Sequence, residues 1–173
     1  MKITDIKTTL LSFPIPEEKR WRTDLGVATK SDNCLIHVDT DSDISGVGIG
    51  YGNPEVIKSI VETQLKPSLL GENPLYVEGL WEKMYSGSRG IPSLNRGVSQ
   101  PSFSRRGDTL CAIAGIDIAL WDILGKFFEK PIYQILGASR HRIRAYASGG
   151  WAPGVEAGEE MAGYAAKGFS AVK

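Results

Sequence analysis

Residues 112–137 read AIAGIDIALWDILGKFFEKPIYQILG, and this stretch decides the fold. It predicts one long helix that runs to about Phe128, with Asp108 or Thr109 as its cap. Apolar residues cover most of the circumference of this helix, so we expect it to be buried on several sides. Small residues let neighbouring elements approach it closely, at Ala112, Ala114, Gly115 and Ala119.

The same helix carries two aspartates and a lysine. Asp122 and Lys126 are four residues apart with the acid first, an order that stabilises an exposed helix by about 0.2–0.5 kcal/mol. Asp117 lies on a different face, where burial would require a partner. We therefore expect a structural role for Asp117 rather than a catalytic one.

The first fifty residues predict a three-stranded antiparallel meander. The strands are expected at residues 3–11, around residues 34–38 and at residues 44–51, with a polar turn at residues 40–43. One side of the third strand carries only glycine, at Gly46, Gly48 and Gly50. A spacing of two does not fit a phosphate-binding loop, so these glycines favour close packing of another element.

Helices are expected after the meander. Asn53 is a candidate N-cap, Pro54 suits the first helical position, and Pro67 is expected to end this helix. Asn73 and the proline after it repeat the start signal. A second apolar stripe follows, in which the tryptophan and the methionine are expected to fill the core, at Val77, Leu80, Trp81, Met84 and Tyr85.

Residues 86–107 are rich in serine and glycine and break the helical pattern. They contain four arginines and no acidic residue before Asp108, at Arg89, Arg96, Arg105 and Arg106. A solvated loop is the simpler interpretation. The alternative is a segment that contributes to binding an anion or a neighbouring subunit.

The last part of the chain predicts a strand, a helix and a strand. The strands are expected at residues 142–147 and 169–173, and the helix at residues 156–167 with Gly168 as its C-cap. This order implies parallel pairing and a right-handed crossover. An α+β segment therefore leads into the start of an α/β architecture.

Composition limits the class of function. The 173 residues carry 20 basic and 20 acidic side chains, which disfavours a dedicated nucleic-acid or membrane-surface protein. No apolar run reaches the roughly 20 residues that span a bilayer. The N-terminus is a poor signal peptide, so a cytoplasmic location is expected. Cys34 and Cys111 are expected to act as small buried hydrophobic residues.

The long helix and its flank resemble the signature of the mandelate racemase and muconate-lactonizing branch of the enolase superfamily. The matching pattern is AxAGIDxALxDIxGK from Ala112 to Lys126, then Pro131-Ile132 and Leu136-Gly137, with Ile135 where leucine is usual. Further segments follow in the family's order: the GxGxG strand, Tyr146-Ala147-Ser148, and the ending GFSAVK. The resemblance covers essentially the whole chain.

The resemblance implies a fold with two parts. Residues 1–130 would form the α+β capping domain, a three-stranded antiparallel meander followed by helices. Residues 131–173 would form the first βαβ unit of an incomplete TIM (β/α) barrel. The sequence ends within the second expected barrel strand, so we expect it to represent only the N-terminal portion of such an enzyme.

The resemblance also implies a chemistry. Members bind Mg²⁺ through three carboxylates and abstract the proton next to a substrate carboxylate, with a lysine or histidine as base. That proton is weakly acidic, so the developing charge must be neutralised as it forms. The implied reaction is dehydration of an acid sugar, or racemisation or epimerisation of a related carboxylate. The partners implied are a small carboxylate substrate and, in the intact enzyme, identical subunits.

Candidate site residues follow from the resemblance. Lys173 matches the first lysine of the family's KxK motif at the end of the second barrel strand, where two close ammonium groups depress each other's pKa. Trp21 would shield the site from water, and Arg22 would pair with a carboxylate. The full set of substrate-binding candidates is Trp21, Arg22, Asp24, Tyr51 and Ser148. The simpler interpretation is an ordinary strand-end lysine and solvated loop residues.

No metal ligand is assigned within the 173 residues, and Mg²⁺ is expected only in the intact enzyme. The sequence stops before the second lysine of the motif. We therefore expect no turnover from these residues alone. The alternative is a non-catalytic capping-type module that binds a partner or oligomerises.

Overall fold

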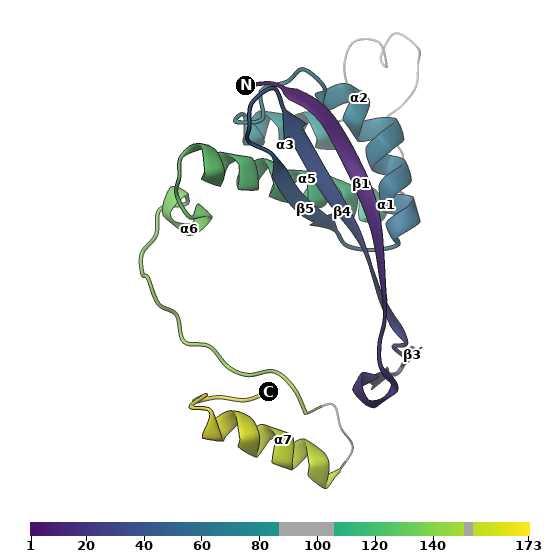
Figure 1. The fold of residues 1–173 in the computed structure, drawn as a ribbon, viewed down its shortest axis with the longest axis vertical. Helices are drawn as coiled ribbons and strands as arrows, with labels where there is room; N and C mark the ends of the chain where they lie inside the picture. Colours follow the sequence, from purple (N-terminus) through teal and green to yellow (C-terminus); the bar gives the residue numbers. More distant parts are fainter. Residues whose placement is uncertain (87–105, 151–153) are drawn as a thin grey trace. The chain divides into compact units, whose positions relative to one another are not determined.

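The computed structural model describes residues 1–86, 106–150 and 154–173. The chain forms two compact units (Figure 1). The sheet unit comprises Met1–Ser12 with Asp32–Gly137, and the terminal unit comprises Phe13–Ser31 with Ala138–Lys173. In the described part of the chain, no helix has the length and apolar character needed to cross a membrane.

The sheet has the order β1 (Ile3–Pro14), β4 (Lys30–Thr40) and β5 (Gly46–Gly50). β4 and β5 are antiparallel, with Cys34 opposite Gly50. β1 runs antiparallel to β4, because Lys7 bonds Asp39 toward one end of the pair and Ser12 bonds Asp32 toward the other. The predicted antiparallel meander is confirmed.

Helices cover one face of this sheet (Figure 1). They are α1 (Pro54–Ile60), α3 (Val77–Ser86) and α5 (Arg106–Phe127). The β4 side chains on that face are completely buried, at Cys34, Ile36 and Val38. All buried residues of the main hydrophobic core belong to the sheet unit.

The glycine side of β5 faces α5. A Cβ added to Gly48 would lie 1.9 Å from the carbonyl oxygen of Gly115, and one added to Gly46 would lie 2.0 Å from that of Ala119. At Gly115 itself, an added Cβ would lie 2.9 Å from the backbone nitrogen of Gly50. Strand and helix therefore meet through backbone atoms, which confirms the close packing expected of these glycines.

The start of the first helix follows its sequence signal. The Asn53 side chain accepts hydrogen bonds from the backbone N–H groups of Glu55 (3.1 Å) and Val56 (3.4 Å), with Pro54 at the first helical position. These bonds satisfy N–H groups that have no partner inside the helix.

The prediction that this helix ends at Pro67 is wrong. The chain continues through a π-helical stretch, Val61–Leu65, into α2, Lys66–Leu69. A proline within a helix lacks one N–H and its ring presses on the preceding turn. The wider π turn directly before α2 accommodates the ring, so the chain remains helical to Leu69.

α3 begins at Val77, later than the Asn73 signal suggests. Asn73 instead forms a turn, accepting the N–H of Leu75 on its side chain (3.1 Å) and that of Tyr76 on its carbonyl (3.1 Å). Met84 is buried as expected. The expectation of a core position for Trp81 is wrong, because this residue is 36% exposed and stacks on Tyr85 at the surface.

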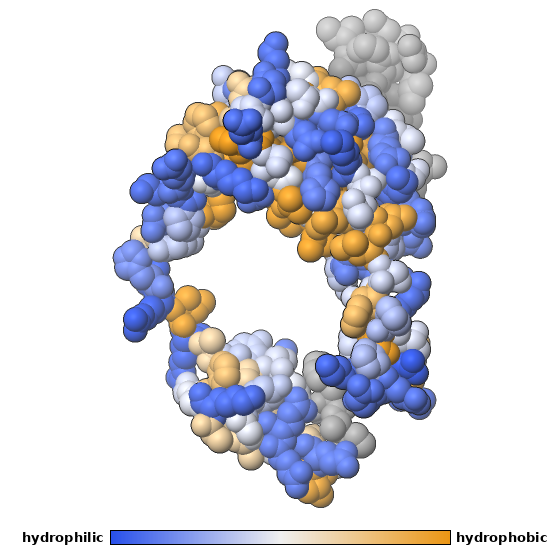
Figure 2. Space-filling model, in the orientation of Figure 1, coloured by the Kyte–Doolittle hydropathy of each residue, from blue (hydrophilic) through white to orange (hydrophobic). Residues whose placement is uncertain are grey.

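α5 begins at Arg106, so Asp108 lies in its first turn and the expected cap at Asp108 or Thr109 is wrong. Its core face is wide, but Ile118 on another face is half exposed. Figure 2 shows apolar residues at the surface of both units. The predicted loop at residues 86–107 lies mostly outside the described residues, and so do Arg89, Arg96 and Arg105.

The stretch after Pro16, whose candidates Trp21, Arg22 and Asp24 could be solvated loop residues, contains regular structure. A 3₁₀ turn, Glu17–Lys19, precedes a small hairpin of β2 (Arg22–Thr23) and β3 (Gly26–Val27). Gly26 adopts a φ of +129°, a conformation that L side chains rarely adopt and glycine reaches freely. This glycine allows a two-residue turn between the strands.

The last part of the chain has the expected order but little strand. A short helix α6 (Ile132–Ile135) is followed, after an extended segment, by α7 (Val155–Ala166), which Gly168 ends with a φ of +92°. The two predicted strands are reduced to one parallel bridge between Ala147 and Val172. Two isolated strands pair weakly, which explains why the pairing does not extend.

Candidate functional site

Lys173 and Ser148 lie side by side in the terminal unit. Around the bridge, the Ala147 N–H donates to Ala171 (3.1 Å) and the Lys173 N–H donates to the carbonyl of Ala147 (2.9 Å). Since Ala147 lies opposite Val172, the next residues, Ser148 and Lys173, are also in register. Side chains alternate along strands, so both leave the face opposite to that of Ala147.

Helix α7 holds the backbone that follows Ser148. The Glu160 carboxylate accepts the Gly150 N–H on one oxygen (3.0 Å) and the Tyr164 hydroxyl on the other (3.0 Å). The hydrogen bond from the Tyr164 hydroxyl to Glu160 is the main cause that raises the pKa of Tyr164, and the negative charge of Glu160 raises it further. The sequence patterns did not single out Glu160, although paired glycines after a strand and a Glu-x-x-x-Tyr spacing in the next helix were available signals.

Three further candidates lie on one hairpin of the terminal unit. Trp21 precedes β2 and accepts the Ala28 N–H on its carbonyl (2.9 Å), and Arg22 lies opposite Val27. Asp24 lies in the turn that joins the two strands. All three side chains are exposed, which suits contact with a ligand and also suits a solvated loop.

Tyr51 lies in the sheet unit directly after β5 and is 82% exposed. Within the terminal unit, the structure therefore brings Ser148 and Lys173 into register, and it gathers Trp21, Arg22 and Asp24 on one hairpin. Tyr51 belongs to a different compact unit from the other five candidates.

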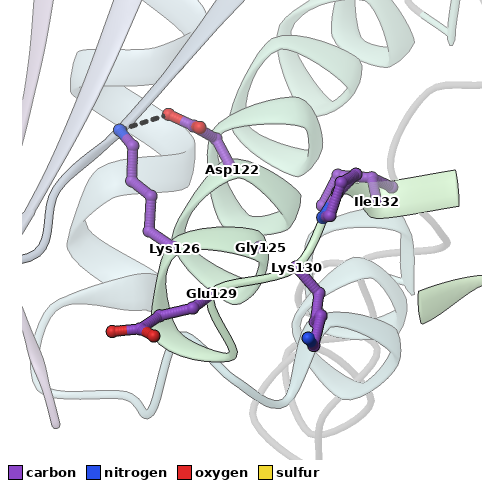
Figure 3. Close-up of a pocket in the computed structure, with 7 residues that line it drawn as sticks. Asp122, Gly125, Lys126, Glu129, Lys130 and Ile132 are labelled. Carbon is purple, nitrogen blue, oxygen red and sulfur yellow. Dashed lines mark hydrogen bonds and ion pairs between the residues drawn. The ribbon is translucent and has the colours of Figure 1, made fainter. Parts of the chain in front are cut away.

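A pocket of about 440 Å³ lies at the C-terminal end of α5 (Figure 3). Two of the charged residues that line it, Asp122 and Lys126, are occupied by structural contacts. Lys126 Nζ bonds Asp122 (2.7 Å) and the carbonyl of Ser45 (2.8 Å), and the Val47 N–H donates to Asp122 (2.9 Å). The predicted acid-first pair is confirmed, and it fastens the edge of β5 to α5 rather than forming a reactive site.

Asp117 is half buried in α5. Burial is the main cause that raises the pKa of Asp117, and the negative charge of Glu78 in α3 raises it further. A raised pKa in a cleft can mark a catalytic acid. Here burial and the charge of Glu78 account for the raised pKa, so the shift alone does not make Asp117 a catalytic acid.

The described residues do not form a metal centre. In the ranges 1–86, 106–150 and 154–173, no group of three His, Cys, Asp or Glu side chains is placed to hold a metal ion. Carboxylate oxygens are the usual ligands of Mg²⁺. This part of the chain therefore does not fit a complete magnesium site.

The sequence matches a family model described as the mandelate racemase / muconate lactonizing enzyme, N-terminal domain, over residues 7–137. Arabinonate dehydratase from Saccharolobus solfataricus is 35% identical over 153 residues, covering 86% of this chain and 38% of that protein. D-mannonate dehydratase from Xanthomonas oryzae pv. oryzicola is 31% identical over 142 residues, covering 80% and 30%.

Solved structures are similar over nearly the whole chain. A member of the enolase superfamily from Polaromonas sp. JS666 is 32% identical with a TM-score of 0.78, covering 99% of this chain and 43% of that one. The 3,6-anhydro-D-galactonate cycloisomerase from Zobellia galactanivorans is 29% identical with a TM-score of 0.74, covering 99% and 42%. The chain thus spans less than half the length of each of these proteins.

Proposed function

The chain belongs to the mandelate racemase / muconate lactonizing enzyme family, and on this premise we propose that the protein carrying it dehydrates an acid sugar. The supporting comparison is the 35% identity to an arabinonate dehydratase across 86% of the chain. In the proposed reaction, a base removes the proton next to the substrate carboxylate, and the neighbouring hydroxyl leaves as water. The enol that forms becomes a 2-keto-3-deoxy acid.

The observation that carries the proposal is the register of Lys173 beside Ser148 at the carboxyl ends of two parallel segments. Ligand-binding groups of (β/α) barrels lie at that end of the strands. In the proposal Lys173 lies in the reacting region, and Ser148 contacts substrate there. Trp21, Arg22, Asp24 and Tyr51 are the remaining proposed contacts, with Arg22 suited to bind a carboxylate.

Several further parts of the proposal come from the family. The cofactor would be Mg²⁺, which stabilises the developing negative charge when bound. Its ligands would come from residues other than those described. The boundary between the capping part, residues 1–130, and the barrel part, residues 131–173, and assembly into a homo-oligomer are also proposed. Residues 1–173 would show no turnover alone.

The test uses the whole protein that carries this chain, assayed with Mg²⁺ against a panel of aldonic acids. We expect a 2-keto-3-deoxy acid from at least one of them. Replacing a general base or a group that tunes it costs roughly 100- to 10,000-fold in rate, so Lys173→Met should lower kcat by at least about 100-fold. Lys130→Met is the control, since Lys130 is an exposed residue of the same type that is not among the proposed site residues.

Full activity of Lys173→Met would rule out the assigned role of this lysine. Formation of an epimer without a keto acid would replace dehydration by racemisation or epimerisation. A protein that turns over no carboxylate, yet assembles through this chain, would favour the non-catalytic alternative.

A further inference from the structure

Two adjacent glycines follow Ser148, and the space around the first has no room for a side chain. A Cβ added to Gly149 would lie 2.6 Å from a Glu160 carboxylate oxygen and 2.7 Å from the Tyr164 ring. Gly150 has a φ of +74°, and a Cβ there would lie 2.3 Å from the end of the Met161 side chain. The backbone after Ser148 therefore rests directly on α7.

Consecutive backbone groups tie this segment to two neighbours. The Gly149 N–H donates to the carbonyl of Lys173 (2.9 Å), and the Gly150 N–H donates to Glu160 (3.0 Å). The second Glu160 oxygen is held by the Tyr164 hydroxyl, which fixes the orientation of the carboxylate. Hydrogen bonds to a charged acceptor are about twice as strong as neutral ones.

We propose that Glu160 is a positioning residue, which holds the Gly149–Gly150 backbone and thereby keeps Ser148 in register with Lys173. Only one bridge joins the two described segments. The register of so short a contact needs support from outside the pair, since isolated strand pairs are marginal. This inference rests on the proposed function of Lys173 and Ser148 and adds a residue that touches neither substrate nor base.

The test compares Glu160→Ala, Glu160→Gln and Glu160→Asp in the whole protein that carries this chain. Glu159→Ala is the matched control, since it is the same residue type at the adjacent, exposed position of α7. Two readouts are taken well below the melting temperature of each variant: hydrogen exchange of the Gly150 amide, and kcat and KM with the acid sugar that the wild type dehydrates.

We expect Glu160→Ala to speed Gly150 exchange at least about tenfold and to lower kcat at least about tenfold with KM changed less than about twofold, since lost alignment costs rate more than binding. Glu160→Gln keeps an acceptor at the same length and should recover part of both effects. Glu160→Asp is too short to reach Gly150 and should resemble alanine. The Glu159→Ala control should match the wild type in both readouts.

The outcomes separate this inference from the function on which it rests. Faster exchange at Gly150 with an unchanged kcat would overturn the positioning role and leave the proposed function standing. Unchanged exchange in Glu160→Ala would also overturn it, because the contact would then not hold the backbone. A wild-type protein that dehydrates no acid sugar would overturn both.

Discussion

At Gly48 the contact between the sheet and α5 depends on the absence of one carbon atom. The nearest neighbour of an added Cβ is a helix carbonyl oxygen, 1.9 Å away, rather than a flexible side chain. A backbone oxygen can move only if the helix moves with it, and protein interiors are too closely packed to yield easily. Gly48 is therefore one of the positions that set how near α5 can lie to β5.

We expect Gly48→Ala to lower the free energy of unfolding by about 3 kcal/mol or more, at the upper end of the range for overpacking. Gly79→Ala provides the control, because an added Cβ at this exposed position of α3 meets nothing within 4 Å. It should stabilise the chain by about 0.5–1 kcal/mol, as alanine does when it replaces glycine within a helix. Urea denaturation of the two variants measures both values, and equal stabilities would contradict the packing argument.

Asp117 gives a prediction that depends on pH. Because folding raises the pKa of Asp117, the folded state favours the protonated carboxyl. The resulting stabilisation is complete below the ordinary aspartate pKa of about 3.9 and is lost as the pH rises through the folded pKa. Asp117→Asn should therefore be more stable than the wild type at about pH 7, and this difference should shrink as the pH falls to about 3.5. A gap that widens on acidification would contradict the assigned cause.

Among the elements, the strand β5 lies at one edge of its sheet, where backbone groups need other partners. Asp122 of α5 supplies one by accepting the Val47 N–H, and Lys126 supplies another by donating to Ser45. An exposed strand edge is a template for pairing with further chains. The two charged residues of the long helix therefore satisfy this edge as well as each other.

Asp122→Ala should cost about 1.5–3 kcal/mol, the typical value of a hydrogen bond to a charged group. Lys126→Met leaves the bond between Val47 and Asp122 in place and should cost about 1 kcal/mol or less, as for an exposed ion pair. Thermal unfolding of both variants provides the comparison. If the lysine variant proved the less stable, the bond to Val47 would not be the main contribution of Asp122.

Sequence patterns predicted these elements well where a local signal agreed with the core. The meander followed from the alternation of apolar residues along the strands. The first helix followed from Asn53, whose side chain bonds only N–H groups next to it in the sequence when it acts as a cap. The errors occurred where a local signal competed with packing. Pro67 is tolerated because Leu65 and Leu69 are both buried in the core, which favours continued helix over a stop.

At the scale of the whole molecule, the core is unevenly divided. All buried residues of the main cluster lie in the sheet unit, whereas the buried apolar residues described in the terminal unit are Ile15 and Ala147. Buried apolar contacts supply most of the free energy that resists local opening. The unit that carries Ser148 and Lys173 therefore has the weaker support of the two.

Native-state hydrogen exchange of the 173-residue chain should reveal this difference. We expect the Lys173 amide, bonded to Ala147 in the terminal unit, to exchange at least about tenfold faster than the Ile116 amide in the middle of α5. Low concentrations of urea should remove the protection of Lys173 first. Equal protection at the two amides would show that the terminal unit has a core of comparable strength.

The candidate site could be predicted only in part. The strand–helix–strand order predicted parallel pairing, but the register that sets Ser148 beside Lys173 comes from the structure, because connectivity fixes the direction of two strands and not their register. The role of Glu160 depends on a contact between the Gly149–Gly150 backbone and α7, which the paired glycines and the Glu-x-x-x-Tyr spacing permit but do not specify. The hairpin at Arg22 was missed for a similar reason, since strands of two residues leave almost no alternation to detect.

The glycine contact between β5 and α5 has a mechanical consequence. A Cβ added to Gly48 or Gly46 would meet the carbonyl oxygen of Gly115 or Ala119, and one added to Gly50 would lie 3.6 Å from that of Cys111. Two strand residues therefore match four helix residues. Those intervals are about 6.6 Å along a strand and about 6.0 Å along a helix. Because these intervals nearly match, the helix and strand backbones stay in close contact over successive turns of α5.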